Sequence, residues 1–242
     1  LIVSRKTAPH LLKVSELKKG EIKPIMLDLT GVTGGTYSYN MGALANGHVY
    51  IASLSGSQAS PLKIYYWDTP TSKPEVIADI KVSDIPGADN ISVNIDKNGN
   101  GFIFFGDNAS TKFLRLTVSN HKTIGEPKVL TSSADATMVT NVYRIEDTDQ
   151  YVWSGVRLPV TLVDESLGSK YAMNKSNLET EAVAPRIFTF NEERYLIVCS
   201  AGQGSASKAT PSLVVYNLTK GSTVAEAMQK FDEGDNHNPD YK

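Results

Sequence analysis

The chain has 242 residues, of which 40% are hydrophobic and 21% are charged, and its formal net charge is −2. This length allows one or two domains with a core that needs no disulfide, and the single cysteine excludes an intrachain disulfide or a cysteine-rich zinc site. The balance of 24 basic against 26 acidic residues argues against a nucleic-acid binder, and the apolar runs are far shorter than the ~20 residues of a membrane-spanning helix.

Short strand-like runs recur along the chain in five groups. The first group, residues 1–29, contains runs at 1–5, 11–14 and 22–27. The next two groups, 37–83 and 90–133, contain four runs each: 39–44, 48–54, 62–65 and 75–80, then 91–96, 101–107, 113–116 and 127–131. The last two groups, 140–174 and 185–231, contain three runs each: 141–147, 151–156 and 160–163, then 186–191, 195–201 and 213–216.

The spacing of these runs predicts the fold. The first two runs of each of the last four groups flank turn-forming residues such as Asn46-Gly47, which is typical of a tight hairpin. Four short antiparallel strands about every 45–50 residues are the signature of a β-propeller blade. We therefore predict an all-β chain with one β-propeller domain over residues 1–231, followed by a polar tail or linker at 232–242. About five four-stranded blades are visible, either as a ring with one thin blade or as part of a six- to eight-bladed ring. The alternative fold is a β-sandwich.

Two segments have helical patterns. Residues 11–20 could form a short helix that ends at Gly20, and only the repeat register favours a strand there. Near residues 223–231 the pattern is stronger, because Thr223 and Glu226 have capping-box spacing and an apolar face follows them. We predict one short helix at 223–231.

The sequence contains few motifs that point to catalysis or metal binding. Cys199 lies in an apolar run and is interpreted as a core thiol, while His10, His48, His121 and His237 are dispersed and are interpreted as surface or strand residues. The residues Asp96, Asn98 and Asn100 fit the start of a calcium loop, with Asp107 at its twelfth position, but a strand-like run separates them. We expect no cofactor and an ordinary Asn/Gly hairpin at this loop, with calcium there as the alternative.

Binding residues are expected on the long connections between blades, which share one face of a propeller with the loops between second and third strands. Aromatic rings and guanidinium groups suit a sugar or an anionic ligand. The candidates on or near this long-loop face are Tyr37, Tyr39, Arg5, Arg157 and Arg186.

Three runs carry a resemblance to a known group of proteins. They are Gly47-His-Val-Tyr-Ile-Ala-Ser53, Pro61-Leu-Lys-Ile-Tyr-Tyr-Trp-Asp68 and Pro211-Ser-Leu-Val-Val-Tyr-Asn217. The chain resembles β-propeller domains of exported or lipid-anchored surface proteins of unknown function from Bacteroides-type gut bacteria. The resemblance implies a periplasmic or cell-surface protein, anchored through a leader absent here, and it carries over no catalytic residue.

Together these observations favour a non-enzymatic binding module of an exported surface protein that contacts a glycan or a protein through its long-loop face. No nucleic-acid partner and no membrane insertion by this segment are expected. The alternatives are a structural scaffold domain or a propeller-type glycoside hydrolase or lyase, which needs converging carboxylates. Candidate carboxylates on inner strands are Asp96, Glu146 and Asp147, and looser candidates in the blade connections are Asp28, Asp84, Asp89 and Asp135.

Overall fold

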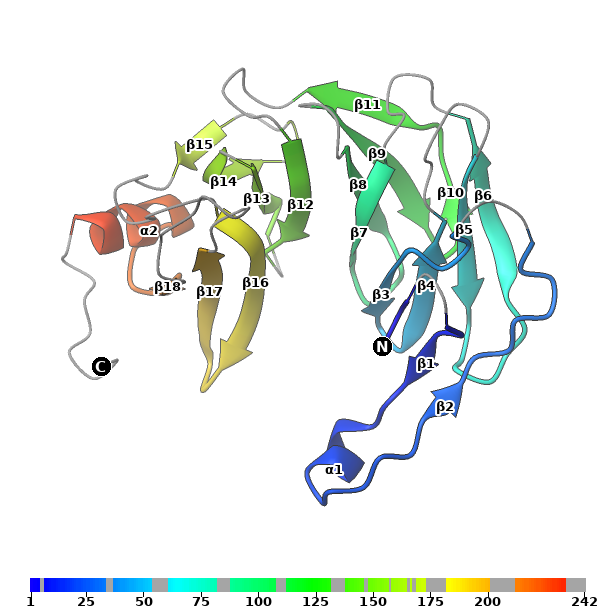
Figure 1. Cartoon of the computed structure of the whole chain (residues 1–242). Coiled ribbons are helices and arrows are strands. Elements are labelled where there is room, and N and C mark those ends of the chain that lie inside the picture. Colours follow the sequence, from blue (N-terminus) through cyan, green and yellow to red (C-terminus); the bar gives the residue numbers. More distant parts are fainter. Residues whose placement is uncertain are drawn as a thin grey trace, which may run out of the picture. The chain divides into compact units, whose positions relative to one another are not determined.

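The structure is a computed structural model made of two compact units, residues 1–131 and 132–242, which are described separately. It describes residues 1–4, 7–33, 37–53, 61–81, 88–107, 112–131, 138–145, 148–156, 158–164, 166, 169–172, 182–200 and 212–233 (Figure 1).

The first full sheet of unit 1 follows the chain order of its four antiparallel strands, β3 (Met41–Ala45), β4 (His48–Ala52), β5 (Leu62–Trp67) and β6 (Glu75–Ile80). Asn46 and Gly47 connect β3 and β4 with positive φ angles of 51° and 85°, the conformation that an Asn-Gly hairpin turn requires. The predicted run 75–80 coincides with β6, and the predicted hairpin is confirmed.

The second sheet of unit 1 contains β7 (Ala88–Ile95), β8 (Gly101–Asp107) and β9 (Lys112–Ser119). Its fourth position is shared by β10 (Thr123–Ile124) and β11 (Lys128–Thr131), which both pair with β9. A core between the two sheets includes Tyr50, Ile64 and Tyr66 from the first sheet and Ile103 and Leu116 from the second. Each of the two sheets therefore buries one of its faces against the other sheet.

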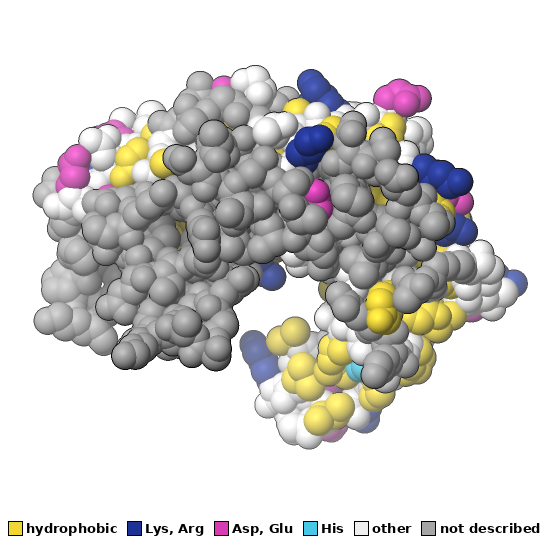
Figure 2. Space-filling view, turned by 45° about the horizontal axis from the view of Figure 1, so that its top comes forward, with side chains coloured by type: hydrophobic (Ala, Val, Ile, Leu, Met, Phe, Trp, Pro, Cys, Tyr) yellow, Lys and Arg dark blue, Asp and Glu magenta, His cyan; other side chains and the backbone are white. Residues whose placement is uncertain are grey.

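The first repeat does not form a four-stranded sheet among the described residues. It contains β1 (His10–Leu11), α1 (Val14–Leu17) and β2 (Ile25–Met26), with β1 and β2 paired antiparallel. Residues 11–20 were compatible with either a short helix or a strand, and the structure has the helix α1 within this range. Gly20 follows the helix with a φ of 77°. Val14 and Ile22 project into solvent, and Figure 2 shows hydrophobic side chains over this segment.

The N-terminal segment instead covers the outer face of the first sheet. Leu11 and Leu27 are buried with Val49, Ile51 and Trp67, which alternate along β4 and β5 with the residues of the inner core. The Trp67 Nε1–H donates to the Asp28 carbonyl at 2.8 Å and fixes this cover in place.

Unit 2 contains two further antiparallel sheets. The first follows the order β12 (Met138–Arg144), β13 (Gln150–Val156), β14 (Leu158–Asp164), β15 (Ser169–Ala172), and the second the order β16 (Ala182–Phe190), β17 (Glu193–Ser200), β18 (Ser212–Asn217).

The chain continues after β18 into α2 (Val224–Asp232), which confirms the predicted short helix. The Thr223 hydroxyl accepts a hydrogen bond from the Glu226 N–H at 3.1 Å, as the capping-box spacing predicts. Ala227 and Met228 are buried, and Met228 joins a core with Leu196 and Tyr216.

Candidate functional site

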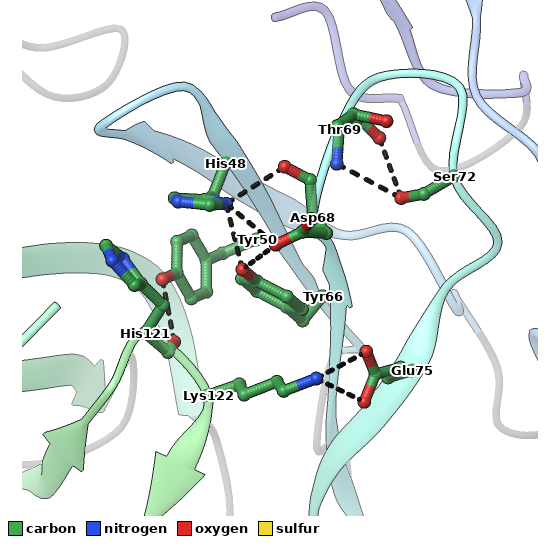
Figure 3. Close-up of polar contacts among 9 residues, drawn as sticks. All are labelled: His48, Tyr50, Tyr66, Asp68, Thr69, Ser72, Glu75, His121 and Lys122. Carbon is green, nitrogen blue, oxygen red and sulfur yellow. Dashed lines mark hydrogen bonds and ion pairs between the residues drawn. The ribbon is translucent and has the colours of Figure 1, made fainter.

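Polar side chains gather at the end of unit 1 where both sheets make their tight turns (Figure 3). We call this group the hairpin-end cluster and define it as His48, Tyr66, Asp68, Glu75, His121 and Lys122. His48 begins β4, Tyr66 and Asp68 lie at the end of β5, Glu75 begins β6, and His121 and Lys122 lie in the turn between β9 and β10. The cluster therefore straddles the two sheets.

The hydrogen bonds of His48 determine which of its ring nitrogens carries the proton. Its Nδ1 lies 2.9 Å from the Asp68 carbonyl oxygen and 2.8 Å from the Tyr66 hydroxyl oxygen. The carbonyl can only accept, and the Tyr66 hydroxyl uses its own hydrogen on Asp68 Oδ1 at 2.9 Å. Nδ1 is therefore the donor, and the neutral His48 ring keeps a lone pair on Nε2.

The second imidazole belongs to His121, whose ring centroid lies 4.2 Å from that of His48. The Tyr50 hydroxyl donates to the His121 carbonyl at 2.7 Å, and the His121 N–H donates to the Gly99 carbonyl at 3.0 Å. Its ring Nδ1 is buried and has no hydrogen-bond partner within the described part of the chain. Burial lowers the pKa of His121, with a further contribution from His48, so the ring is held in its neutral form.

Charged groups border the two rings. The Lys122 ammonium donates to both carboxylate oxygens of Glu75, at 2.8 and 3.0 Å, and lies 5.9 Å from the centre of the Tyr66 ring. The side chains of Asp68, Glu75 and Lys122 are 66%, 53% and 47% exposed, whereas the Tyr66 and Tyr50 rings are buried. Burial also raises the pKa of both tyrosines, which keeps their hydroxyls protonated as donors. The cluster thus presents exposed donors and acceptors on a buried aromatic base.

The structure places the predicted binding residues at several separate positions. Arg5 and Arg157 lie outside the described residues. Tyr37 has a left-handed φ of 66° and is exposed, while Tyr39 packs against the N-terminal cover of the first sheet. Arg186 is exposed on β16 of unit 2, where its guanidinium lies 4.9 Å from the centre of the Tyr143 ring and donates to the Tyr143 hydroxyl. Among the described residues, Arg186 is thus a predicted arginine that contacts an aromatic ring.

The loop predicted as an alternative calcium site forms a closed turn. Asp96 Oδ1 accepts the N–H groups of Asn98 and Asn100 at 2.8 and 2.9 Å, and Asn100 Oδ1 accepts the Asn120 N–H at 3.2 Å. Asp107 lies at the far end of β8, about 20 Å from the turn at ~3.3 Å per strand residue. Among the described residues no group of three or more metal-ligating side chains occurs, and calcium at this loop stays a prediction.

The remaining candidate residues, which are carboxylates, Cys199 and His237, do not form a site among the described residues. The Thr30 side chain, and then the Thr30 N–H that donates to Asp28 Oδ1 at 2.8 Å, hold the pKa of the Asp28 carboxyl below its usual value. For Asp89 and Cys199 the structure describes the backbone only, in β7 and β17. Glu146, Asp147, Asp84, Asp135 and His237 lie outside the described residues.

Comparison with known proteins identifies the family. A family model described as a domain of unknown function, DUF4623, matches residues 1–242. The chain belongs to the DUF4623 family. A crystal structure of a DUF4623 protein from Bacteroides eggerthii is 66% identical to it, with a TM-score of 0.83 over 99% of this chain and 56% of that protein. This chain therefore spans little more than half the length of that relative, and the resemblance to Bacteroides proteins is confirmed.

More distant structures share the fold alone. The structures of U3-55K and of the RRP9 WD40 repeats each have a TM-score of 0.51, cover 77% of this DUF4623 chain and are 11% and 12% identical to it. Together with the four antiparallel sheets of three to five strands, these likenesses confirm the predicted β-propeller. The predicted count of about five blades is too high, because the described residues of the first repeat form only the two-stranded sheet β1–β2. No curated protein matches the chain. Within the described ranges no helix has the length and apolar character needed to cross a membrane.

Proposed function

We propose that this DUF4623 chain is a non-enzymatic binding module of an exported surface protein and that the hairpin-end cluster binds a carbohydrate. The observation that carries the proposal is a pair of ordered polar groups at the junction of two sheets. The exposed Asp68 carboxylate accepts from the Tyr66 hydroxyl, and the His48 ring is held by the contact of its Nδ1 with the Asp68 carbonyl. A carboxylate and an imidazole nitrogen can both bind hydroxyl groups, and a sugar carries several hydroxyls that can reach polar groups pointing in different directions.

A carbohydrate also suits the other groups of the cluster. A hydroxyl donates and accepts, so one sugar can donate to His48 and Asp68 and accept from the ammonium of Lys122. The planar His121 ring lies beside them and offers the C–H face of a sugar a flat, weakly polar surface. Since His121 is held neutral, this surface carries no charge that would favour an anion.

The cluster is organised before any ligand arrives. The buried Tyr66 hydroxyl fixes both His48 and Asp68, and the buried Tyr50 hydroxyl fixes the backbone of His121. A site that is already ordered loses less conformational freedom on binding, which favours affinity in a small, exposed site. The exported location rests on the resemblance to Bacteroides surface proteins and is part of the proposal.

The proposal is tested by titrating the chain calorimetrically with glucose, galactose, mannose and arabinose and with oligosaccharides built from them. We expect at least one of them to bind. Asp68→Asn and His48→Phe should weaken that binding about 10-fold or more, since each removes a charged or well-oriented acceptor. Arg186→Ala is the matched control, because Arg186 lies in unit 2 and on the predicted long-loop face.

Two outcomes would contradict the proposal. If Arg186→Ala abolishes binding and Asp68→Asn does not, the ligand binds at the long-loop residues instead of the hairpin-end cluster. If chromatography after long incubation shows that an oligosaccharide has been cleaved, and the cleavage scales with the concentration of the purified chain, the module is an enzyme. Absence of binding to the whole panel would reject carbohydrate as its ligand.

A further inference from the structure

The Asp68 carboxylate carries a charge that no lysine or arginine in the described part of the chain neutralises. Its Oδ1 accepts the Tyr66 hydroxyl at 2.9 Å and lies 3.5 Å from His48 Nδ1 (Figure 3). Its Oδ2 has no hydrogen-bond partner among the described residues. The ammonium of Lys122 donates to both oxygens of Glu75 and is occupied there. Asp68, whose side chain is mostly exposed, therefore has an oxygen that can accept a further donor.

Carboxylates outnumber ammonium groups around the aromatic rings at this turn. Burial raises the pKa of Tyr66, and the negative charges of Asp68 and Glu75 add to the effect. Burial lowers the pKa of His121, and there Asp68 and Asp96 act in the opposite direction. Three carboxylates thus act on these rings, whereas the hairpin-end cluster holds one lysine and no arginine. This surface therefore favours a positive charge over a negative one.

The rings themselves also attract a cation. The His48 and Tyr66 rings are stacked, with centroids 5.4 Å apart and planes 27° from parallel. The Lys122 ammonium lies 5.9 Å from the centre of the Tyr66 ring, a distance at which the electrons of an aromatic face attract a positive charge. A second ammonium bound at Asp68 would lie near the same rings, because the Asp68 carboxylate accepts the Tyr66 hydroxyl.

We propose that the hairpin-end cluster selects a sugar with a free amino group, which binds to Asp68 as an ammonium ion. The inference rests on the proposed function and names the class of sugar. A protonated amine brings three donors and a positive charge, so its hydrogen bonds to a carboxylate are stronger than those of a neutral hydroxyl. The hydroxyls next to the amine on the sugar ring can then reach the other polar groups of the cluster. An N-acetylated sugar lacks the charge and should bind like a neutral sugar.

Glucosamine, N-acetylglucosamine and glucose test the inference, because they share one ring and differ only at C2. Calorimetric titration at pH 7.0 and low salt should show that glucosamine binds about 3- to 5-fold more tightly than the other two, the upper range for an exposed ion pair. At about 0.5 M NaCl the difference should shrink, since salt screens exposed charges. Galactosamine and galactose repeat the comparison with a different ring stereochemistry.

Three variants identify the group that selects the amine. Asp68→Asn keeps an oxygen that can accept the Tyr66 hydroxyl but removes the charge, so it should abolish the preference for glucosamine. Lys122→Gln removes a like charge beside the site and should increase the preference. Asp79→Asn is the matched control and should leave the preference unchanged. It makes the same change in net charge toward the other end of β6, in an ion pair with Lys63.

The outcomes distinguish this inference from the proposed function. The inference is overturned, and carbohydrate binding stands, if glucose binds at least as tightly as glucosamine or if the preference for glucosamine survives Asp68→Asn. The same conclusion follows if a neutral sugar binds and neither amino sugar does. If propylamine binds as tightly as glucosamine, or if no sugar binds at all, both proposals fail.

Discussion

The ring centroids of His48 and His121 lie 4.2 Å apart with their planes tilted by 45°, although the two residues belong to different sheets. The contact depends on the turn that precedes β8. Gly99 has a φ of 77° and approaches the His121 backbone so closely that its carbonyl accepts the His121 N–H. The contact between the two imidazole rings therefore depends on the packing of the two sheets of unit 1 at this turn.

We expect the stability of the chain to fall below about pH 6.5 because of His121. Burial, and then His48, lower the pKa of this ring in the folded chain, whereas Asp68 and Asp96 act weakly in the opposite direction. The unfolded chain then binds more protons than the folded chain, so the free energy of unfolding is greatest above the ordinary histidine pKa and decreases as the pH falls through the lowered value. Urea unfolding at pH 7.5 and 5.5 measures this.

His121→Gln should make the two urea midpoints more nearly equal. His10→Gln is the control, because His10 lies in β1 and is distant from the cluster in the pairing pattern. A loss of stability at pH 5.5 that is the same in the wild type and in His121→Gln would show that another group is responsible.

A pair of glycines separates backbone conformation from steric contact. Gly20 and Gly99 both have a φ of 77°, but a Cβ at Gly20 would meet no atom within 4 Å, whereas a Cβ at Gly99 would lie 2.2 Å from the His121 nitrogen. Gly20→Ala should therefore cost only the left-handed strain of about 1 kcal/mol. Gly99→Ala should cost about 3 kcal/mol, because the turn must also move away from His121. Denaturant unfolding of both variants tests this, and equal losses would contradict the proposed packing of the turn.

Local patterns were sufficient to predict most of the strands. The runs 75–80 and 101–107 match β6 and β8, because each combines apolar residues with turn formers at both ends. The first repeat was not predictable in the same way. Its apolar residues pack onto the neighbouring sheet instead of pairing into a blade, and the exposed Val14 and Leu17 lie one turn apart in a short helix.

The hairpin-end cluster left no signal in the sequence. His48 and His121 have no ligand-like spacing, and they meet only because a hairpin of one repeat packs on a turn of the next. The sequence pattern at Asp96, in contrast, is a real local signal that has two physical meanings. Oxygen-rich side chains in a tight turn can bind a cation or accept backbone N–H groups, and in this structure Asp96 Oδ1 accepts two of them.

Two tyrosines of unit 2 should each stabilise the attachment of α2. The Tyr216 hydroxyl donates to Asp232 Oδ1 at 2.9 Å, and the Tyr171 hydroxyl donates to the other oxygen of the same carboxylate. We expect Tyr216→Phe and Tyr171→Phe each to lower the free energy of unfolding by about 1–2 kcal/mol, since each removes a hydrogen bond to a charged group. The double variant should lose less than the sum if the two bonds share the role of holding Asp232, and strict additivity in urea unfolding would show that they act independently.

The start of α2 offers a test of how the helix is held on its sheet. Thr223→Ala removes the hydroxyl that accepts the Glu226 N–H, and one backbone donor then loses its protein partner. The expected loss is about 1 kcal/mol, which corresponds to a decrease of about 2–4 °C in the midpoint of thermal unfolding for a chain of this size. Thr223→Ser keeps the acceptor and should restore the wild-type midpoint. If Thr223→Ser is as unstable as Thr223→Ala, the methyl group of Thr223 matters more than its hydroxyl, and the cap is not what stabilises the helix.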